Sequence, residues 1–227
     1  MTDEEFDDFD DGPEPGPSVI DRLRDNWIAA ALVAVILVGV LVFAFQLIPR
    51  DPGGDSAEAG FARDMSTHHG QAVAMALTMR DRTEDLQVFY LCTDIMLTQQ
   101  NEIGMMTGWL MVWDLNTVGD DKPMAWMGMP MDGLMPGMAT PEQIEQLTTL
   151  PVTDAEILFF QLMIRHHQGG IEMAQALLAR SDNNLVRGVA QQMIVIQSAE
   201  IDTMNQMLEA RGQSPITDPL PDSHEGM

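Results

Sequence analysis

The first strong pattern along the chain is an uncharged apolar run from Trp27 to Ile48. Its 22 residues would span about 33 Å as an α-helix, which is enough to cross the hydrocarbon core of a bilayer. A cleaved signal peptide has a shorter apolar region followed directly by small residues, and Ala57-Glu58-Ala59 comes late for such a site. We therefore predict an uncleaved single-pass anchor over residues 21–49. The N-terminus is expected in the cytoplasm and the larger C-terminal part outside the cell membrane.

From residue 58 onward the apolar positions recur at helical spacing, without a convincing strand pattern. The sequence also matches itself at a shift of 98 residues, which places Phe61 on Phe159. One register holds without a gap, as is typical of a duplicated unit. Four amphipathic helices bury their apolar faces as a bundle, so the predicted fold class is all-α. The two units are predicted as helical hairpins, 58–79 with 83–113 and 153–179 with 183–211.

The segments around these helices differ in composition. Residues 1–20 are rich in acidic side chains and are predicted to be a disordered tail. Thr140-Pro141-Glu142 carries the residue types that begin a helix, here a short one to about Leu150. The predicted organisation is a linker at 50–60, a bundle at 61–211 (hairpin 61–113, Met-rich loop 114–140, hairpin 153–211) and a polar tail at 212–227.

Charge and missing motifs exclude several classes of function. The chain has 11 Lys and Arg against 35 Asp and Glu, a net charge of −24. A basic face for phosphate is therefore lacking, and we predict no nucleic acid partner. The single cysteine excludes a disulfide framework and a Cys-based zinc finger. Nucleotide-binding, serine hydrolase and HExxH motifs are missing, so we predict that the protein is not an enzyme.

Histidine and glutamate fall on the apolar faces of the predicted helices. The doublets His68-His69 and His166-His167 point inward on a helical wheel, and Glu102 and Glu200 lie in the middle of the partner helices' apolar faces. A buried carboxylate is costly unless it is paired or ligated. One interpretation is a Glu–His hydrogen bond that fixes helix register, with methionine as core filler. The other is a metal site, because imidazole, thioether and carboxylate together suit Cu(I), Cu(II) or Zn(II).

Methionine is the second unusual residue type, with 20 in the chain. Six of them lie between Met124 and Met138, where Gly and Pro prevent any one helix face from gathering them. Flexible thioethers can close around a soft ion such as Cu(I) or Ag(I). The alternative is an apolar loop that covers one end of the bundle.

The segments Phe61–Ala76 and Phe159–Ala174, each followed by a Gln-x-x-Glu-Ile-x-x-Met helix, resemble the domain-of-unknown-function 305 family. The resemblance covers about residues 58–211 and includes the Met-Pro-Gly-Met loop. It implies a ferritin-like four-helix bundle in a bacterial, exported or membrane-anchored protein associated with copper. The copies differ at Gly70-Gln71 and Gln168-Gly169, so the two halves need not bind alike. By position, the resemblance implies metal-binding roles for Met65, His68, His69, Met75, Met163, His166, His167 and Met173, and more weakly for Glu102 and Glu200.

Together these patterns predict a membrane-anchored copper-binding protein that sequesters Cu(I) or delivers it to an acceptor. The alternative is a non-catalytic helical module beside a larger membrane protein complex, with a structural His/Glu core. The complete set of predicted metal ligands is Met65, His68, His69, Met75, Glu102, Met106, Met127, Met129, Met131, Met163, His166, His167, Met173, Glu200 and Met204.

Overall fold

The computed structural model describes residues 16, 18–46, 51–119 and 121–220, and every regular element among them is a helix. Two compact units divide the chain between Arg50 and Asp51. The all-α prediction is therefore confirmed for the described residues. The predicted disordered tail lies almost wholly outside them, as does the end of the polar tail.

The N-terminal unit contains α1 (Val19–Asp25) and α2 (Trp27–Gln46). Ser18 begins α1 with a capping box, in which its hydroxyl accepts from the Asp21 amide and the Asp21 carboxylate accepts from the Ser18 amide. The hydrophobic pattern does not predict α1. This short helix crosses the boundary at residue 20 between the predicted tail and the predicted anchor, because a local cap rather than apolar periodicity defines it.

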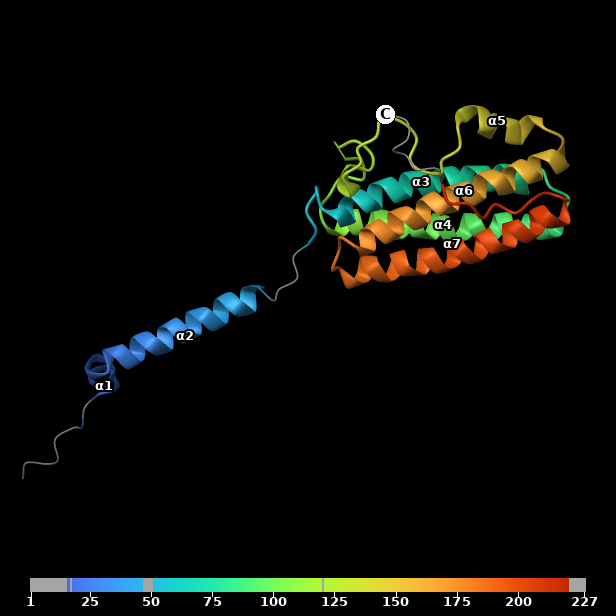
Figure 1. The fold of residues 1–227 in the computed structure, drawn as a ribbon. Helices are drawn as coiled ribbons and strands as arrows, with labels where there is room; N and C mark the ends of the chain where they lie inside the picture. The colour runs from blue at the N-terminus through green and yellow to red at the C-terminus, as the bar shows by residue number, and fades with distance from the viewer. Residues whose placement is uncertain (1–15, 17, 47–50, 120, 221–227) are drawn as a thin grey trace, which may run out of the picture. The chain divides into compact units, whose positions relative to one another are not determined.

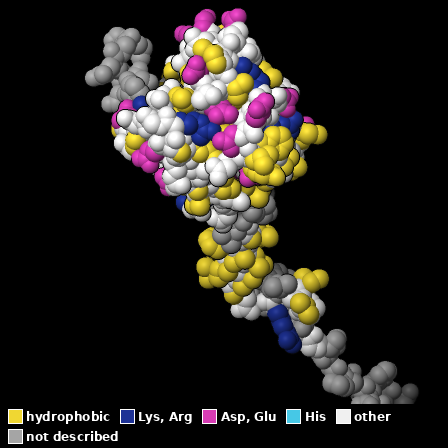
Figure 2. All heavy atoms as spheres, turned by 90° about the vertical axis from the view of Figure 1, so that its right-hand side faces the viewer, with side chains coloured by type: hydrophobic (Ala, Val, Ile, Leu, Met, Phe, Trp, Pro, Cys, Tyr) yellow, Lys and Arg dark blue, Asp and Glu magenta, His cyan; other side chains and the backbone are white. Residues whose placement is uncertain are grey.

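Within α2, the segment Trp27–Ala44 is long and apolar enough to cross a membrane, with a mean hydropathy of 2.9. Hydrophobic side chains cover this helix in Figure 2, whereas acidic and basic side chains are scattered over the visible face of the bundle. Helices of this kind near an N-terminus occur in membrane anchors and in signal sequences alike. The structure thus contains one candidate span among the described residues, and its orientation stays a prediction.

Four long helices form the bundle, as two hairpins that lie side by side in Figure 1. They are α3 (Ala57–Arg80), α4 (Leu86–Val112), α6 (Val152–Leu178) and α7 (Asn184–Ala210). Ser56, Asp85 and Asn183 each accept a hydrogen bond from a first-turn amide at the start of α3, α4 and α7. Because Ser56 is the cap, α3 begins at Ala57, inside the segment that composition assigns to the linker 50–60.

The connection between the hairpins lies on the α3–α6 side of the bundle (Figure 1). It contains the short 3₁₀-helix η1 (Ala125–Met127) and α5 (Pro141–Thr149). Thr140 and Gln143 form a capping box at the start of α5, which confirms the predicted short helix. At its other end Arg82 donates to the carbonyls of Leu147 and Leu150. These bonds fasten α5 to the turn of the first hairpin.

The core consists of two apolar clusters with polar side chains between them. Met65 and Met173 belong to the loop-end cluster, which is the one packed against the Met-rich loop 114–140. Met75 and Met163 belong to the α5-end cluster, which includes Leu147 of α5. Each histidine doublet lies between the two methionines of its own helix. The order is reversed from α3 to α6, so these helices run in opposite directions with their histidines at the same level.

Candidate metal centre

The middle of the bundle holds a polar layer contributed by all four long helices. Its histidines are at most 1% exposed, and its glutamines and Glu102 at most 5%. The inward orientation that the helical wheel predicts for both doublets and for Glu102 is thus confirmed, and Glu200 is only slightly more exposed. The polar layer comprises His68 and His69 of α3, Gln99 and Glu102 of α4, His166 and His167 of α6, and Gln197 and Glu200 of α7.

The second histidine of each doublet binds the glutamate of its own hairpin. His69 Nε2 lies 2.7 Å from Glu102 Oε2, and His167 Nε2 lies 2.7 Å from Glu200 Oε2. The two bonds occupy equivalent positions in the two sequence repeats. Since both carboxylates face an imidazole, they hold the rings in a fixed orientation, which is the register-fixing bond that the sequence offers as one interpretation.

The first histidines of the doublets meet at the centre of the bundle. The rings of His68 and His166 lie against each other with their centroids 3.7 Å apart and their planes tilted by 32°. His68 Nε2 donates to the carbonyl oxygen of Pro136 at 3.1 Å, and His166 Nε2 donates to the carbonyl oxygen of His68 at 3.0 Å. Both rings are therefore oriented by backbone carbonyls, and one of these belongs to the Met-rich loop.

Burial keeps the imidazoles of His68, His69 and His166 neutral. Desolvation lowers the pKa of His68 and of His69 to about 3, with neighbouring histidine charges acting in the same direction. The pKa of His166 also falls well below its ordinary value for the same reasons. Burial raises the pKa of Glu102 to about 7, and the charge of Glu200 adds to that rise. The His69–Glu102 contact is thus a hydrogen bond of a neutral imidazole rather than an ion pair.

Neutral rings with Nε2 as the donor leave Nδ1 as a bare lone pair. A carbonyl oxygen can only accept, so Nε2 of His68 carries the proton and Nδ1 does not. The same holds for His69 whenever its carboxylate partner Glu102 is ionised. Among the described residues, every buried side-chain nitrogen or oxygen without a hydrogen-bond partner belongs to this layer. These atoms are Nδ1 of His68, His69 and His167, both amide atoms of Gln99, and Oε1 of Gln197.

This arrangement matches the way histidine ligands are oriented in metal sites. A ligating imidazole typically donates its other N–H to a carboxylate or a backbone carbonyl, which fixes the tautomer. Glu102 and Glu200, which the sequence offers as ligands, each have one oxygen engaged in that orienting role. No group of three or more His, Cys, Asp or Glu side chains within the described segments is gathered to hold an ion. An ion here would therefore need thioether or amide ligands beside imidazole.

The predicted helix methionines lie on both sides of the polar layer. All six of them are fully buried and follow the cluster division of the core. Met65, Met106 and Met173 are in the loop-end cluster, while Met75, Met163 and Met204 are in the α5-end cluster. The layer is thus enclosed by sulfur-bearing side chains above and below, although the structure does not bring all six to one point.

The predicted ligands of the loop, Met127, Met129 and Met131, are half-buried against the loop-end cluster. Their neighbours Met124 and Met135 are buried in it. The loop therefore covers one end of the bundle, as the packing interpretation expects, and its thioethers adjoin those of Met65 and Met173. Capture of an ion by these half-buried thioethers stays a prediction.

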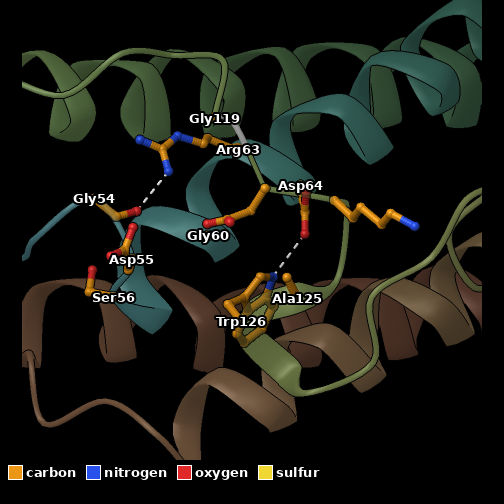
Figure 3. A pocket seen from close by; sticks show the side chains of 11 residues that line it. Gly54, Asp55, Ser56, Gly60, Arg63, Asp64, Gly119, Ala125 and Trp126 are labelled. Atoms are coloured by element: carbon orange, nitrogen blue, oxygen red, sulfur yellow. Dashed lines mark hydrogen bonds between the residues drawn. The ribbon is translucent and has the colours of Figure 1, made fainter.

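Asp64 fastens this loop to α3 (Figure 3). Its carboxylate accepts from the Met124 amide at 2.7 Å and from Trp126 Nε1 at 2.9 Å. Burial raises the pKa of Asp64, while these two bonds oppose the rise. Arg63, which directly precedes Asp64, donates to the carbonyls of Gly54 and Asn116. Adjacent residues of one helix turn thus hold both the linker and the loop.

We expect Asp64→Ala to destabilise the bundle by about 1–3 kcal/mol, because two partly buried donors lose their acceptor. The matched control is Asp132→Ala in the same loop, whose carboxylate pairs only with Lys122 at the surface. That change should alter stability by less than about 0.5 kcal/mol. Urea unfolding followed by tryptophan fluorescence measures both. Equal effects of the two substitutions would contradict the role of Asp64 as the loop's fastening point.

Gln99 and Gln197 also belong to the polar layer. They are not identified from the sequence as site residues, because charged side chains and the usual metal ligands are considered there. Both occupy the same position in the two repeats, three residues before the layer's glutamates. A buried amide at repeat-equivalent positions is the signal that could have identified them. Gly170 makes room for one of them, since a Cβ there would lie 2.5 Å from Gln197 Oε1.

Comparisons with known proteins agree with this architecture. A family model described as a domain of unknown function, DUF305, matches residues 58–208. A DUF305 protein from Streptomyces coelicolor is 45% identical, with a TM-score of 0.69, and is covered over 100% of its length and 73% of this chain. A DUF305 fragment from Deinococcus radiodurans is 32% identical, with a TM-score of 0.60, over 99% of its length and 71% of this chain.

A more distant structural neighbour is CopM in its Cu(I)-bound form. It is 24% identical, with a TM-score of 0.52, over 97% of its length and 69% of this chain. At that identity the likeness shows a shared fold. A comparison with curated proteins found no match. The family match over residues 58–208 exceeds half of the chain, and this chain therefore belongs to the DUF305 family.

Proposed function

We propose that this chain is a membrane-anchored, extracytoplasmic copper-binding protein that sequesters Cu(I) or delivers it to an acceptor. The observation that carries the proposal is the set of buried imidazole Nδ1 atoms without a hydrogen-bond partner, on His68, His69 and His167. They lie in a core whose adjoining clusters are rich in thioethers. Neutral imidazole with thioether is a donor set suited to Cu(I).

The residues have distinct roles in this proposal. The imidazoles retain the ion, while Glu102, Glu200 and the Pro136 carbonyl orient the rings. The half-buried loop methionines bind ions at the loop end of the bundle, apart from the polar layer. Low pKa values favour binding, because an imidazole must be neutral to ligate. Cu(II) and Zn(II) are compatible with the imidazoles but gain little from the thioethers.

Two further observations support the proposal. CopM, which shares the fold, has structures in Cu(I)-, Cu(II)- and Ag-bound forms. From residue 61 on, the chain has 22 Asp and Glu against 8 Lys and Arg, and this excess of negative charge raises the local concentration of cations at the bundle surface. If α2 stays uncleaved as an anchor, the bundle lies outside the cytoplasm. There it would pass Cu(I) to a membrane protein or to a soluble acceptor.

The test is a Cu(I) titration of the full chain in detergent micelles against a chromogenic chelator. Replacing all four layer histidines by alanine should abolish competition with the chelator. Because that variant loses a packed core, the pair Met65→Leu and Met163→Leu provides a second test with nearly conserved volume. We expect it to lower Cu(I) affinity by about 10- to 100-fold while helix content stays unchanged. Met79→Leu, in the α5-end cluster but outside the predicted ligands, is the matched control.

The alternative, a structural His/Glu core in a non-catalytic module of a membrane complex, makes the opposite prediction. It is favoured by the two completed His–Glu bonds, which satisfy one nitrogen of each ring without any ion. Failure of the wild-type chain to compete with the chelator would overturn the copper proposal in favour of this alternative.

A further inference from the structure

The polar layer is closed on the side of α3 and α6. The Pro136 carbonyl lies against His68, and Gln71 exchanges two hydrogen bonds with the Ala139 backbone. The approach is so close that a Cβ on Gly169 would lie 2.0 Å from the Pro136 oxygen. Backbone therefore seals this side, and an ion could reach the histidines here only if the loop detached.

The opposite side, between α4 and α7, is open. A groove of about 480 Å³ runs there, and Glu200 is among its lining residues. The Glu200 side chain is 14% exposed, against 6% for its repeat equivalent Glu102. Since Glu200 binds His167 at 2.7 Å, the groove leads from solvent to a group in direct contact with a buried imidazole.

The two repeats differ at the positions that shape this groove. Ala199, Thr203 and Met207 line it on α7. Their equivalents on α4, at the same shift of 98 residues, are Asn101, Met105 and Trp109. Trp109 is only 9% exposed, so its indole fills space that a methionine leaves free in the other copy. The repeat-equivalent positions near Glu102 thus carry larger side chains than those near Glu200, and Glu102 is the more deeply buried of the two glutamates.

The chemistry of the groove suits a soft cation. Asp94 and Glu200 supply carboxylates, and neither Lys nor Arg is among the residues that line it. An acidic groove with low-dielectric walls concentrates cations. Met207 adds a thioether, which is also packed against the α5-end cluster. The groove thus combines two carboxylates, one of them bound to a buried histidine, with a thioether.

We propose that the α4–α7 groove is the entry and exit route of a soft monovalent cation to the polar layer, with Glu200 as the residue at its inner end. This inference rests on the proposed copper-binding function. It assigns the two repeats different tasks: the second hairpin exchanges the ion with solvent, whereas the first hairpin holds Glu102 and His69 out of reach.

Carboxyl labelling tests access without any metal. The full chain in detergent micelles is treated with a water-soluble carbodiimide and glycine ethyl ester, and modification of Glu200 and Glu102 is followed by peptide mass spectrometry. We expect Glu200 to be modified about tenfold faster than Glu102. Ala199→Trp should slow the modification of Glu200 about tenfold, because the indole covers the groove. Asn101→Trp, at the repeat-equivalent exposed position beside Glu102, is the control and should leave the Glu200 rate unchanged.

Stopped-flow uptake of Cu(I) from a weak chelator then tests the route itself. Ala199→Trp should slow uptake and release about tenfold with the same equilibrium affinity, and Asn101→Trp should do neither. Equal labelling of both glutamates, or unchanged Glu200 labelling in Ala199→Trp, overturns the route whether or not the protein binds copper. Selective labelling of Glu200 in a chain that binds no Cu(I) overturns the copper function instead, and the groove then serves no ion.

Discussion

Acidification from pH 7 to pH 5 is expected to destabilise the metal-free bundle strongly. The unfolded chain binds a proton on His68, His69 and His166 below about pH 6.5, whereas burial keeps these imidazoles neutral in the folded chain down to about pH 3 for the first two. Their contribution to stability is therefore complete above the unfolded pKa and is lost as the pH falls below it.

Glu102 opposes this trend. Its folded pKa of about 7 lies above its unfolded value of 4.5, so its contribution is complete at low pH and is lost as the pH rises through 7. Between pH 4.5 and 6.5 the unfolded chain thus binds three extra protons on histidine and the folded chain one on Glu102. The net two protons correspond to about 3 kcal/mol per pH unit. Over that window the loss approaches about 5 kcal/mol, a large part of a domain's ordinary stability.

Urea unfolding of the full chain in detergent, at pH steps from 7.5 to 4.5 and followed by far-ultraviolet circular dichroism, measures this slope. Glu102→Gln should steepen it, because the opposing carboxyl is gone. His166→Phe should reduce it by about one proton per molecule. A stability that stays flat between pH 7 and 5 would mean that the histidines are charged or hydrated in the folded state, contrary to the neutral layer.

The fold follows from the sequence because its determinants are local. Apolar periodicity over each long helix and caps such as Thr140 need no knowledge of distant contacts, and the predicted helix ends differ from the structure by at most three residues. The repeat supplies the one long-range fact, that two equivalent hairpins must pair. Helix α1 is not predicted from the apolar pattern, because its Ser18 cap rather than an amphipathic face defines it.

The candidate site is predictable in part for the same reason. The helical wheel places the histidines and glutamates on inward faces. It does not show which histidine bonds to which glutamate, because that depends on how the turns align one helix with the next. The bond from His68 to the Pro136 carbonyl and the contact between the His68 and His166 rings are contacts with an irregular loop or between repeats. The asymmetry between Glu102 and Glu200 depends on side-chain sizes one to two turns away, which matter only once α4 faces α7.

Two glycine substitutions are expected to change stability in opposite directions. Gly169→Ala places a Cβ 2.0 Å from the Pro136 carbonyl oxygen and 3.2 Å from the Gly137 amide nitrogen. These are backbone atoms, so the segment must move away from α6. Gly137 has φ +76° and its own Cβ position lies 2.1 Å from the Arg165 carbonyl oxygen, which leaves no room to absorb the shift. We expect a loss of about 2–3 kcal/mol.

Gly70→Ala is the matched control on the equivalent helix. Gly70 lies one residue after the first histidine doublet, is exposed, and has no atom within 4 Å of its Cβ position. Alanine favours a helix over glycine, so this change should stabilise the bundle by about 0.5–1 kcal/mol. Urea unfolding of both variants measures the difference. Gly169→Ala also moves the Pro136 carbonyl away from His68, so this side of the polar layer should open. Amide hydrogen exchange of residues 135–139 should then accelerate. If Gly169→Ala stabilised the bundle as Gly70→Ala does, the loop could not lie against α6 as the structure places it.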